Sequence, residues 1–166
     1  MKKNQQKSYY RRYDDLTDYE EVINLQLREM DIEEVRASSG GLEPREVLKL
    51  SLIASDQVWV VIHNGKIEAV FGVTKTPTSE GIPWFLTTDK FKEFTIAFAK
   101  ESKKVVQEML KEYKRLYNVV SANHKEAIEW LKWLGFTVEK NPITYNDYNF
   151  YYFFMDGSEK EECVIL

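Results

Sequence analysis

Residues 123–136 read Asn123-His124-Lys125-Glu126-Ala127-Ile128-Glu129-Trp130-Leu131-Lys132-Trp133-Leu134-Gly135-Phe136. The apolar residues of this stretch recur at three- and four-residue spacing, which predicts an amphipathic helix from Asn123 to Leu134. Gly135 suits the position after the last helical turn, where a left-handed backbone costs glycine little. Phe136 then opens a strand, so the stretch predicts a helix that lies on a sheet and returns directly into it.

The elements expected around this helix alternate between strands and helices. The expected strands are 9–13, 58–62, 67–73, 81–86, 116–121, 136–139 and 148–155, and the other expected helices are 18–32, 44–52 and 89–113. Asn64-Gly65 is a strong hairpin signal, and Asp18 suits a helix cap. This order predicts an α/β (α+β) fold, with a mixed, mostly antiparallel sheet of six to seven strands and helices on both faces. The last strand carries aromatic residues on both faces, which favours an interior position in the sheet.

The composition suits one domain with a sizeable core. The chain has 166 residues, of which 43% are hydrophobic and 14% aromatic. The formal net charge of −4 argues against a general nucleic-acid binder, which needs a dominant basic face. No apolar run is long enough to span a membrane, and the two histidines and one cysteine are too scattered for a metal site.

Three segments are expected. Residues 1–8 form a flexible basic arm, residues 9–156 a single domain, and residues 157–166 an acidic C-terminal tail. Tails of this kind are either solvated or touch a partner.

The stretch from Asn123 to Phe136 resembles the Asn-x-x-Ala-x-x-x-Tyr-x-x-x-Gly-Phe helix of the GNAT acetyltransferase superfamily. The order of elements is also similar to that fold. The resemblance implies that the sheet opens between its fourth and fifth strands, and that acetyl-CoA is the cofactor if the chain is an enzyme.

A narrower resemblance covers about residues 31–140. The segments that carry it are 31–37, the helix that begins at Glu43-Pro44, Gly72-Val73, 83–89 and 130–136. They resemble a GNAT-like bacteriophage family, the internal virion protein A (inner core protein A) of short-tailed phages. This resemblance implies a location in the virion or in the host bacterial cytoplasm, and other virion proteins or a second copy of the chain as partners. Fold alone does not fix function.

The pyrophosphate of acetyl-CoA is held in the superfamily by a glycine-rich loop before the long helix, because glycine lets backbone N–H groups converge on the anion. The corresponding stretch, 87–95, contains no glycine. Lys90 and Lys92 would attract phosphate, whereas Asp89 and Glu93 would repel it. Leu86, Thr87, Thr88 and Asn123 are the candidate cofactor-binding residues, and Thr88-Asp89 equally suits a helix cap.

The proton chemistry of the superfamily relies on a tyrosine that protonates the leaving thiolate. Counting back from Gly135 places Leu131 there, and counting forward from Asn123 places Trp130 there; neither has a hydroxyl group. The candidate catalytic residues are Asn123, His124 and Glu80. Each also has an ordinary interpretation: Asn123 as a helix cap, His124 as a solvated first-turn histidine, and Glu80 as a solvated turn residue.

The other histidine of the chain, His63, is expected to be exposed beside the hairpin turn.

Three hypotheses for the function follow. The first is a phage virion or assembly protein that uses the GNAT scaffold for interactions, without standard acetyltransferase chemistry. The second is a divergent acetyl-CoA-dependent N-acyltransferase. The third is a host-directed phage effector.

Overall fold

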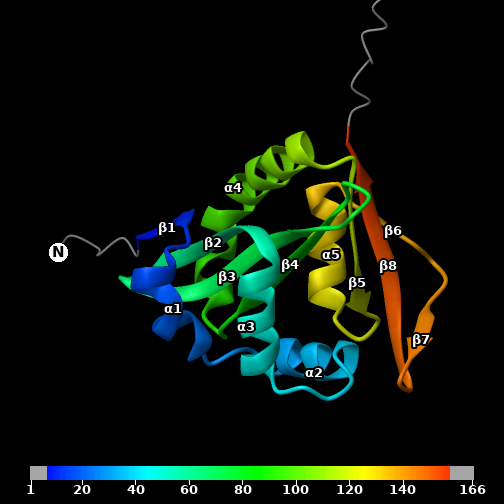
Figure 1. Cartoon of the computed structure of the whole chain (residues 1–166), viewed down its shortest axis with the longest axis horizontal. Helices are drawn as coiled ribbons and strands as arrows, with labels where there is room; N and C mark the ends of the chain where they lie inside the picture. Colours follow the sequence, from blue (N-terminus) through cyan, green and yellow to red (C-terminus); the bar gives the residue numbers. More distant parts are fainter. Residues whose placement is uncertain (1–6, 158–166) are drawn as a thin grey trace, which may run out of the picture.

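The structure is a computed structural model that describes residues 7–157 (Figure 1). Most of the predicted basic arm and of the predicted acidic tail lies outside the described residues. Ser8, which was assigned to the arm, is the first residue of the first strand. No helix in the described part of the chain is both long and apolar enough to cross a membrane.

Thirteen elements follow one another along the chain. The helices are α1 (Asp15–Ile23), α2 (Glu29–Ser38), α3 (Pro44–Ala54), α4 (Phe91–Glu112) and α5 (Lys125–Leu134). The strands are β1 (Ser8–Arg12), β2 (Ser55–His63), β3 (Lys66–Lys75), β4 (Gly81–Thr87), β5 (Arg115–Ser121), β6 (Thr137–Val138), β7 (Ile143–Tyr145) and β8 (Tyr148–Asp156).

The predicted mixed, mostly antiparallel sheet is confirmed, with eight strands rather than six or seven. The strand order is β1-β2-β3-β4-β5-β8-β6, and β7 pairs with β8. The pair β4–β5 is parallel, whereas the other pairs are antiparallel. The predicted hairpin at Asn64-Gly65 is also confirmed, because both residues have the positive φ that its tight turn requires. β8 lies inside the sheet, as its aromatic pattern predicted.

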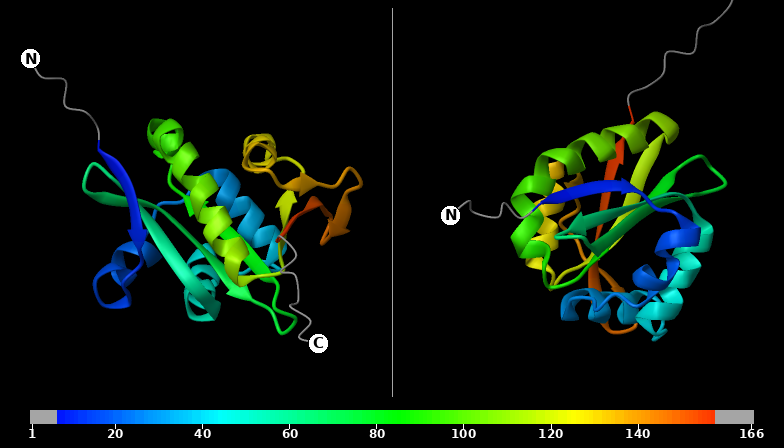
Figure 2. Two further views of the ribbon diagram at one scale, coloured as in Figure 1. Left: turned by 90° about the horizontal axis from the view of Figure 1, so that it is seen from above. Right: turned by 90° about the vertical axis from the view of Figure 1, so that its left-hand side faces the viewer.

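Helices cover both faces of the sheet, and each face has its own core (Figure 2). On one face, residues of α1, α2 and α3, among them Val22, Val35 and Leu48, pack on Val60 and Val70 of β2 and β3. On the other face, α4 and α5 pack on the same two strands and on β5 and β8. The residues of this second core include Trp59, Phe71, Phe94, Phe98, Leu116, Ile128 and Phe153. The aromatic stripe of the long helix is therefore core, as predicted.

The helix expected at 18–32 is wrong, since the structure divides this region into α1 and α2. Asp14, not Asp18, caps α1, and its side chain accepts a hydrogen bond from the N–H of Leu16. The linker between the two helices pairs with the end of β4: Leu27 forms a β-bridge with Thr88, and the Arg28 N–H donates to the carbonyl of Thr87. A continuous helix could not make this pairing, because its backbone groups would bond within the helix.

Candidate functional site

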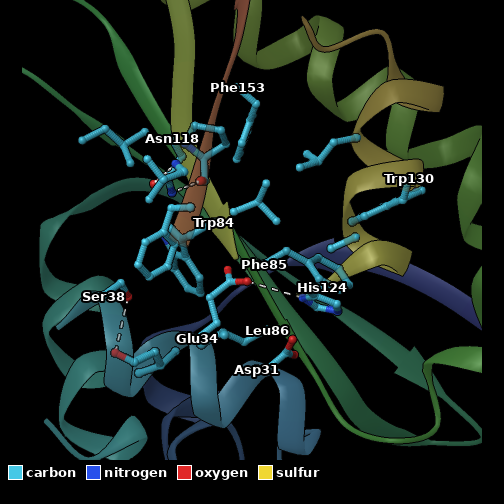
Figure 3. Close-up of a pocket in the computed structure, with 18 of the residues that line it drawn as sticks. Asp31, Glu34, Ser38, Trp84, Phe85, Leu86, Asn118, His124, Trp130 and Phe153 are labelled. Atoms are coloured by element: carbon cyan, nitrogen blue, oxygen red, sulfur yellow. Dashed lines mark hydrogen bonds and ion pairs between the residues drawn. The ribbon is translucent and has the colours of Figure 1, made fainter. Parts of the chain in front are cut away.

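A hollow lies where β4 and β5 separate. These two strands are paired at one position, Gly81 opposite Leu116, near their N-terminal ends. Beyond it they diverge and leave a cavity of about 340 Å³ that passes between the helices of both faces (Figure 3). The lining side chains include Arg28, Asp31, Glu34, Ser38, Trp84, Phe85, Leu86, Asn118, Val119, His124, Glu126, Trp130, Phe150 and Phe153. We call this hollow the cleft.

The backbone of β4 forms one wall of the cleft. The Thr88 N–H donates to the carbonyl of Glu68. The even-numbered residues of β4 therefore direct their backbone N–H and C=O groups toward β3. Those with odd numbers, Pro83, Phe85 and Thr87, direct their backbone polar groups toward β5. The side-chain amide of Asn118 donates to the Pro83 carbonyl, and the N–H and C=O of Thr87 are both bonded to the α1–α2 region. Phe85 is left, within the described residues, with a backbone N–H and C=O that face the cleft without a partner.

Helix α2 supplies two carboxylates, one to each wall. Asp31 accepts a hydrogen bond from the Thr87 N–H of β4 at 2.9 Å. Glu34 accepts one from the Ser121 N–H of β5 at 3.1 Å. The two residues are three positions apart, close to one helical turn, so they share a face of α2 and can reach both strands. α2 therefore holds the open ends of β4 and β5 in place.

Asp31 is buried, with 4% of its surface exposed. Its carboxylate also pairs with the guanidinium of Arg28 at 2.8 Å. Burial raises the pKa of Asp31 above its ordinary value, and the hydrogen bonds from Arg28 and the Thr87 N–H oppose this shift without cancelling it.

His124 is buried, not solvated, with 5% of its surface exposed. Its Nδ1 lies 3.4 Å from Oε2 of Glu34, so α5 and α2 meet across the cleft through this pair (Figure 3). The ordinary interpretation of His124 as a solvated first-turn residue is wrong, because α2 covers the start of α5. Of the three catalytic candidates, His124 is the one whose side chain lines the cleft.

The other two catalytic candidates lie elsewhere. Asn123 is exposed and does not line the cleft, and α5 is capped by His124 without a side-chain hydrogen bond. The expected Asn123 cap is therefore wrong. Glu80 lies in the turn before β4, at the end where β4 and β5 are closed, and accepts a hydrogen bond from the Thr78 hydroxyl.

Of the cofactor-binding candidates at the end of β4, one lines the cleft and two bind within the protein. Leu86 lines the cleft. Thr87 is fully buried, and its hydroxyl donates to the Glu68 carbonyl. The Thr88 hydroxyl donates to the Glu68 carboxylate and accepts from the Lys90 N–H just before α4. Thr88 thus closes the turn before α4, but the N-cap of α4 is Lys90, which makes no side-chain capping hydrogen bond, so the expected Thr88-Asp89 cap is wrong. The hydroxyls of Thr87 and Thr88 are engaged within the protein.

Trp130 occupies the family's tyrosine position when the helix is counted forward from Asn123. Its ring packs against Phe85, Phe91 and Phe98 and lines the cleft. Its indole Nε1 is buried and has no hydrogen-bond partner among the described residues. An indole N–H donates a hydrogen bond but does not release its proton at any ordinary pH, so it cannot replace the acid function of a phenol.

His63, expected to be exposed, is also buried, with 3% of its surface exposed. Ser8 of β1 lies 2.6 Å from its Nδ1, and Glu93 of α4 lies 3.3 Å from its Nε2. It does not line the cleft.

Sequence reasoning missed Glu34, Asn118 and Arg28, which line the cleft. Glu34 lies in a helix whose course was not predicted, and a single asparagine inside a strand is a weak pattern. The signal that existed was the 31–37 segment of the phage resemblance, which contains Asp31 and Glu34. Over residues 7–157 no cluster of three or more His, Cys, Asp or Glu residues is arranged to hold a metal ion.

Solved structures of acetyltransferases share this architecture. A GNAT-family acetyltransferase from Streptococcus pneumoniae is 14% identical, with a TM-score of 0.58, over 90% of this chain and 99% of that one. A spermidine N-acetyltransferase chimera from Vibrio cholerae and hSSAT is 13% identical, with a TM-score of 0.65, over 91% of this chain and 96% of that one. A Bacillus subtilis acetyltransferase solved in complex with CoA is 9% identical, with a TM-score of 0.61, over 90% and 99%.

The chain has the GNAT fold. No protein-family model and no curated protein sequence matches it. At these identities the likeness establishes the arrangement of helices and strands, and the GNAT part of the predicted fold is confirmed. The narrower phage resemblance stays a prediction.

Some groups of the cleft could hold part of a CoA molecule, and others could not. The unpartnered N–H and C=O of Phe85 can pair with an amide of a pantetheine arm that lies between the strands. The start of α4 fits the pyrophosphate poorly, because the N–H groups of Thr88 and Lys90 are already bonded to Glu68 and Thr88. Lys90 and Lys92 are exposed there and supply the positive charge that remains.

Proposed function

We propose that this protein is a divergent N-acyltransferase that takes an acyl-CoA into the cleft between β4 and β5. The observation that carries the proposal is the separation of these strands beyond Gly81 and Leu116, with the backbone of Phe85 facing the gap. An acyl-CoA supplies the acyl group as a thioester. The Phe85 backbone would hold the pantetheine arm, and the exposed Lys90 and Lys92 would face the phosphates.

The first experiment measures whether acetyl-CoA binds. Isothermal titration calorimetry with acetyl-CoA is expected to give a dissociation constant in the micromolar range, and acetyl-CoA is expected to raise the melting temperature. Release of CoA thiol in the presence of primary amines then measures turnover. No heat, no thermal shift and no turnover would reject the proposal.

Two substitutions at Phe85 test the place of binding. Phe85→Pro removes the N–H that faces the cleft, and the ladder with β3 survives because that N–H does not point toward β3. Phe85→Ala also removes the ring but keeps the N–H, so it is the matched control. We expect acetyl-CoA to bind at least tenfold more weakly to the proline variant than to the alanine variant, the loss of about one hydrogen bond. Equal affinities would place the pantetheine elsewhere.

A second candidate is a phage virion or assembly protein that uses the scaffold for interactions. Two observations favour it: the missing glycines and tyrosine, and the engagement of the Thr87 N–H and C=O by Asp31 and Arg28. Other virion proteins or a second copy of the chain would be the partners.

Mass spectrometry of purified phage particles tests this candidate. Stoichiometric amounts of the protein in the particles, together with no acetyl-CoA binding, would favour the virion role. Production in infected cells without incorporation into particles would favour a host-directed effector instead.

A further inference from the structure

The cleft combines aromatic rings with a carboxylate that is paired with no lysine or arginine in the described residues and lies beside His124. Glu34 lines it, and 27% of its side chain is exposed. Its Oε2 atom accepts from the Ser121 N–H and lies near His124, whereas Oε1 makes no hydrogen bond with residues of the described part. In Figure 3 the carboxylate lies among the labelled side chains of Trp84, Phe85 and His124.

The charges around the cleft favour a cation. Three acidic residues line it: Asp31, Glu34 and Glu126. Arg28 is the single lysine or arginine in the lining, and its guanidinium is paired with Asp31 and lies over the ring of Phe91. The negative charge of Glu34 is therefore uncompensated by any lysine or arginine within residues 7–157. A partly buried carboxylate in this situation is stabilised by a cation that arrives with the ligand.

The rings around the carboxylate favour a cation that carries an aromatic or similarly flat apolar group. They come from both sides of the cleft and include Trp84, Phe85, Phe91, Trp130, Phe150 and Phe153. Ring faces attract an ammonium group, and ring edges and faces pack against a further ring. A volume of about 340 Å³ admits a small arylalkylamine and excludes a folded protein.

We propose that Glu34 binds the ammonium group of an arylalkylamine in the cleft through Oε1. This inference rests on the proposed function, because it names the acceptor class for that site. The Ser121 N–H holds the opposite oxygen of the carboxylate, and His124 lies against the same oxygen. The carboxylate that binds the ammonium group therefore comes from α2, since β4 carries no carboxylate.

The test measures amine binding without acyl-CoA. Tryptophan fluorescence of the full chain is followed as 2-phenylethylamine is added at pH 8, and 2-phenylethanol serves as the neutral ligand of the same shape. The amine is expected to bind at least tenfold more tightly than the alcohol. Glu34→Gln is expected to remove this preference, and Glu34→Asp, which keeps the charge, to retain part of it.

Glu33→Gln is the matched control. Glu33 is exposed on the same helix, and its substitution removes the same charge. It is expected to bind the amine as the wild type does. Circular dichroism melts confirm that each variant is folded. Equal binding of amine and alcohol by the wild type, or an unchanged preference in Glu34→Gln, would overturn the inference.

The failure of this inference and the failure of the proposed function give different results. If acetyl-CoA binds but the amine preference is absent, the acyltransferase proposal stands and the role of Glu34 is wrong. If the amine preference depends on Glu34 but acetyl-CoA does not bind, the ammonium site stands and the transferase proposal is wrong.

Discussion

Asp31 and Thr87 are joined by a hydrogen bond of 2.9 Å from the backbone N–H of Thr87 to the Asp31 carboxylate. The bond ties α2 to the end of β4, where a GNAT fold opens its sheet. It also uses a backbone N–H that would otherwise face the cleft. The packing of α2 therefore decides both the shape of the site and which strand groups remain for a ligand.

Asp31→Asn is expected to change stability in a pH-dependent way. Because burial raises the pKa of Asp31, the folded protein keeps this proton to a higher pH than the unfolded chain does. The unfolding free energy of the wild type therefore falls as pH rises from about the ordinary value of 3.8 through the raised pKa. The asparagine variant lacks this contribution, so its stability relative to wild type should be greater at pH 7 than at pH 4. Urea denaturation at both values measures this, with Glu33→Gln as control; a constant difference would contradict it.

Asp18→Asn should change stability with the opposite pH dependence, so that the variant is less stable relative to wild type at pH 7 than at low pH. Hydrogen bonds from the Arg11 guanidinium at 2.6 and 2.8 Å lower the pKa of Asp18. The stabilisation is present above the ordinary value of 3.8 and is lost as pH falls through the lowered pKa. At pH 7 we expect a cost of about 2 kcal/mol, since the charged bonds are partly exposed.

The same denaturation series, extended to pH 3, measures the effect for Asp18. Glu20 is an exposed residue of α1, so Glu20→Gln is the control and should leave the unfolding free energy nearly unchanged. A cost that is as large at pH 3 as at pH 7 would show that shape, not charge, accounts for it.

Substitution of phenylalanine for the two tryptophans of the cleft, Trp84 and Trp130, is expected to lower the unfolding free energy by different amounts. The Trp84 indole N–H donates to the Ser55 hydroxyl at 2.8 Å, whereas that of Trp130 has no partner among the described residues. Both substitutions to phenylalanine remove similar volume. Trp84→Phe should therefore destabilise by about 1 kcal/mol more than Trp130→Phe, since only it breaks a hydrogen bond. Thermal and urea unfolding of the two variants measure the difference; a larger cost at Trp130 would show that its N–H has a partner.

Gly81→Ala should weaken the junction of β4 and β5. A Cβ atom at this position would lie 2.8 Å from side-chain atoms of Leu116 and Val73 and 2.9 Å from Tyr113. These contacts are too short, so the side chains of Leu116, Val73 and Tyr113 or the strands that carry them must shift. We expect a loss of about 2 kcal/mol in unfolding free energy. Thr78→Ala, in the exposed turn before β4, should be near neutral; equal stability of Gly81→Ala and wild type would disprove the tight junction.

Much of the fold could be predicted because its signals are local. Asn64-Gly65 permits the turn of its hairpin, and the aromatic stripe of α4 follows the helical period. The start of α2 could not be predicted, since residues 24–28 leave the helix to pair with the end of β4, which lies far along the chain. No local pattern encodes that pairing.

The sequence by itself determined the order of the elements from β2 to β6, the glycine-free start of α4 and the absence of a tyrosine at either position that the helix count gives, Trp130 or Leu131. These are properties of residue type and spacing. The tertiary structure alone decided that His63 and His124 are buried, that Asn123 and Glu80 lie outside the cleft, and that Glu34 lies inside it. Burial and proximity depend on which distant segments pack together, and here β4, β5 and α2 are brought to one place by the core rather than by their neighbours in the chain.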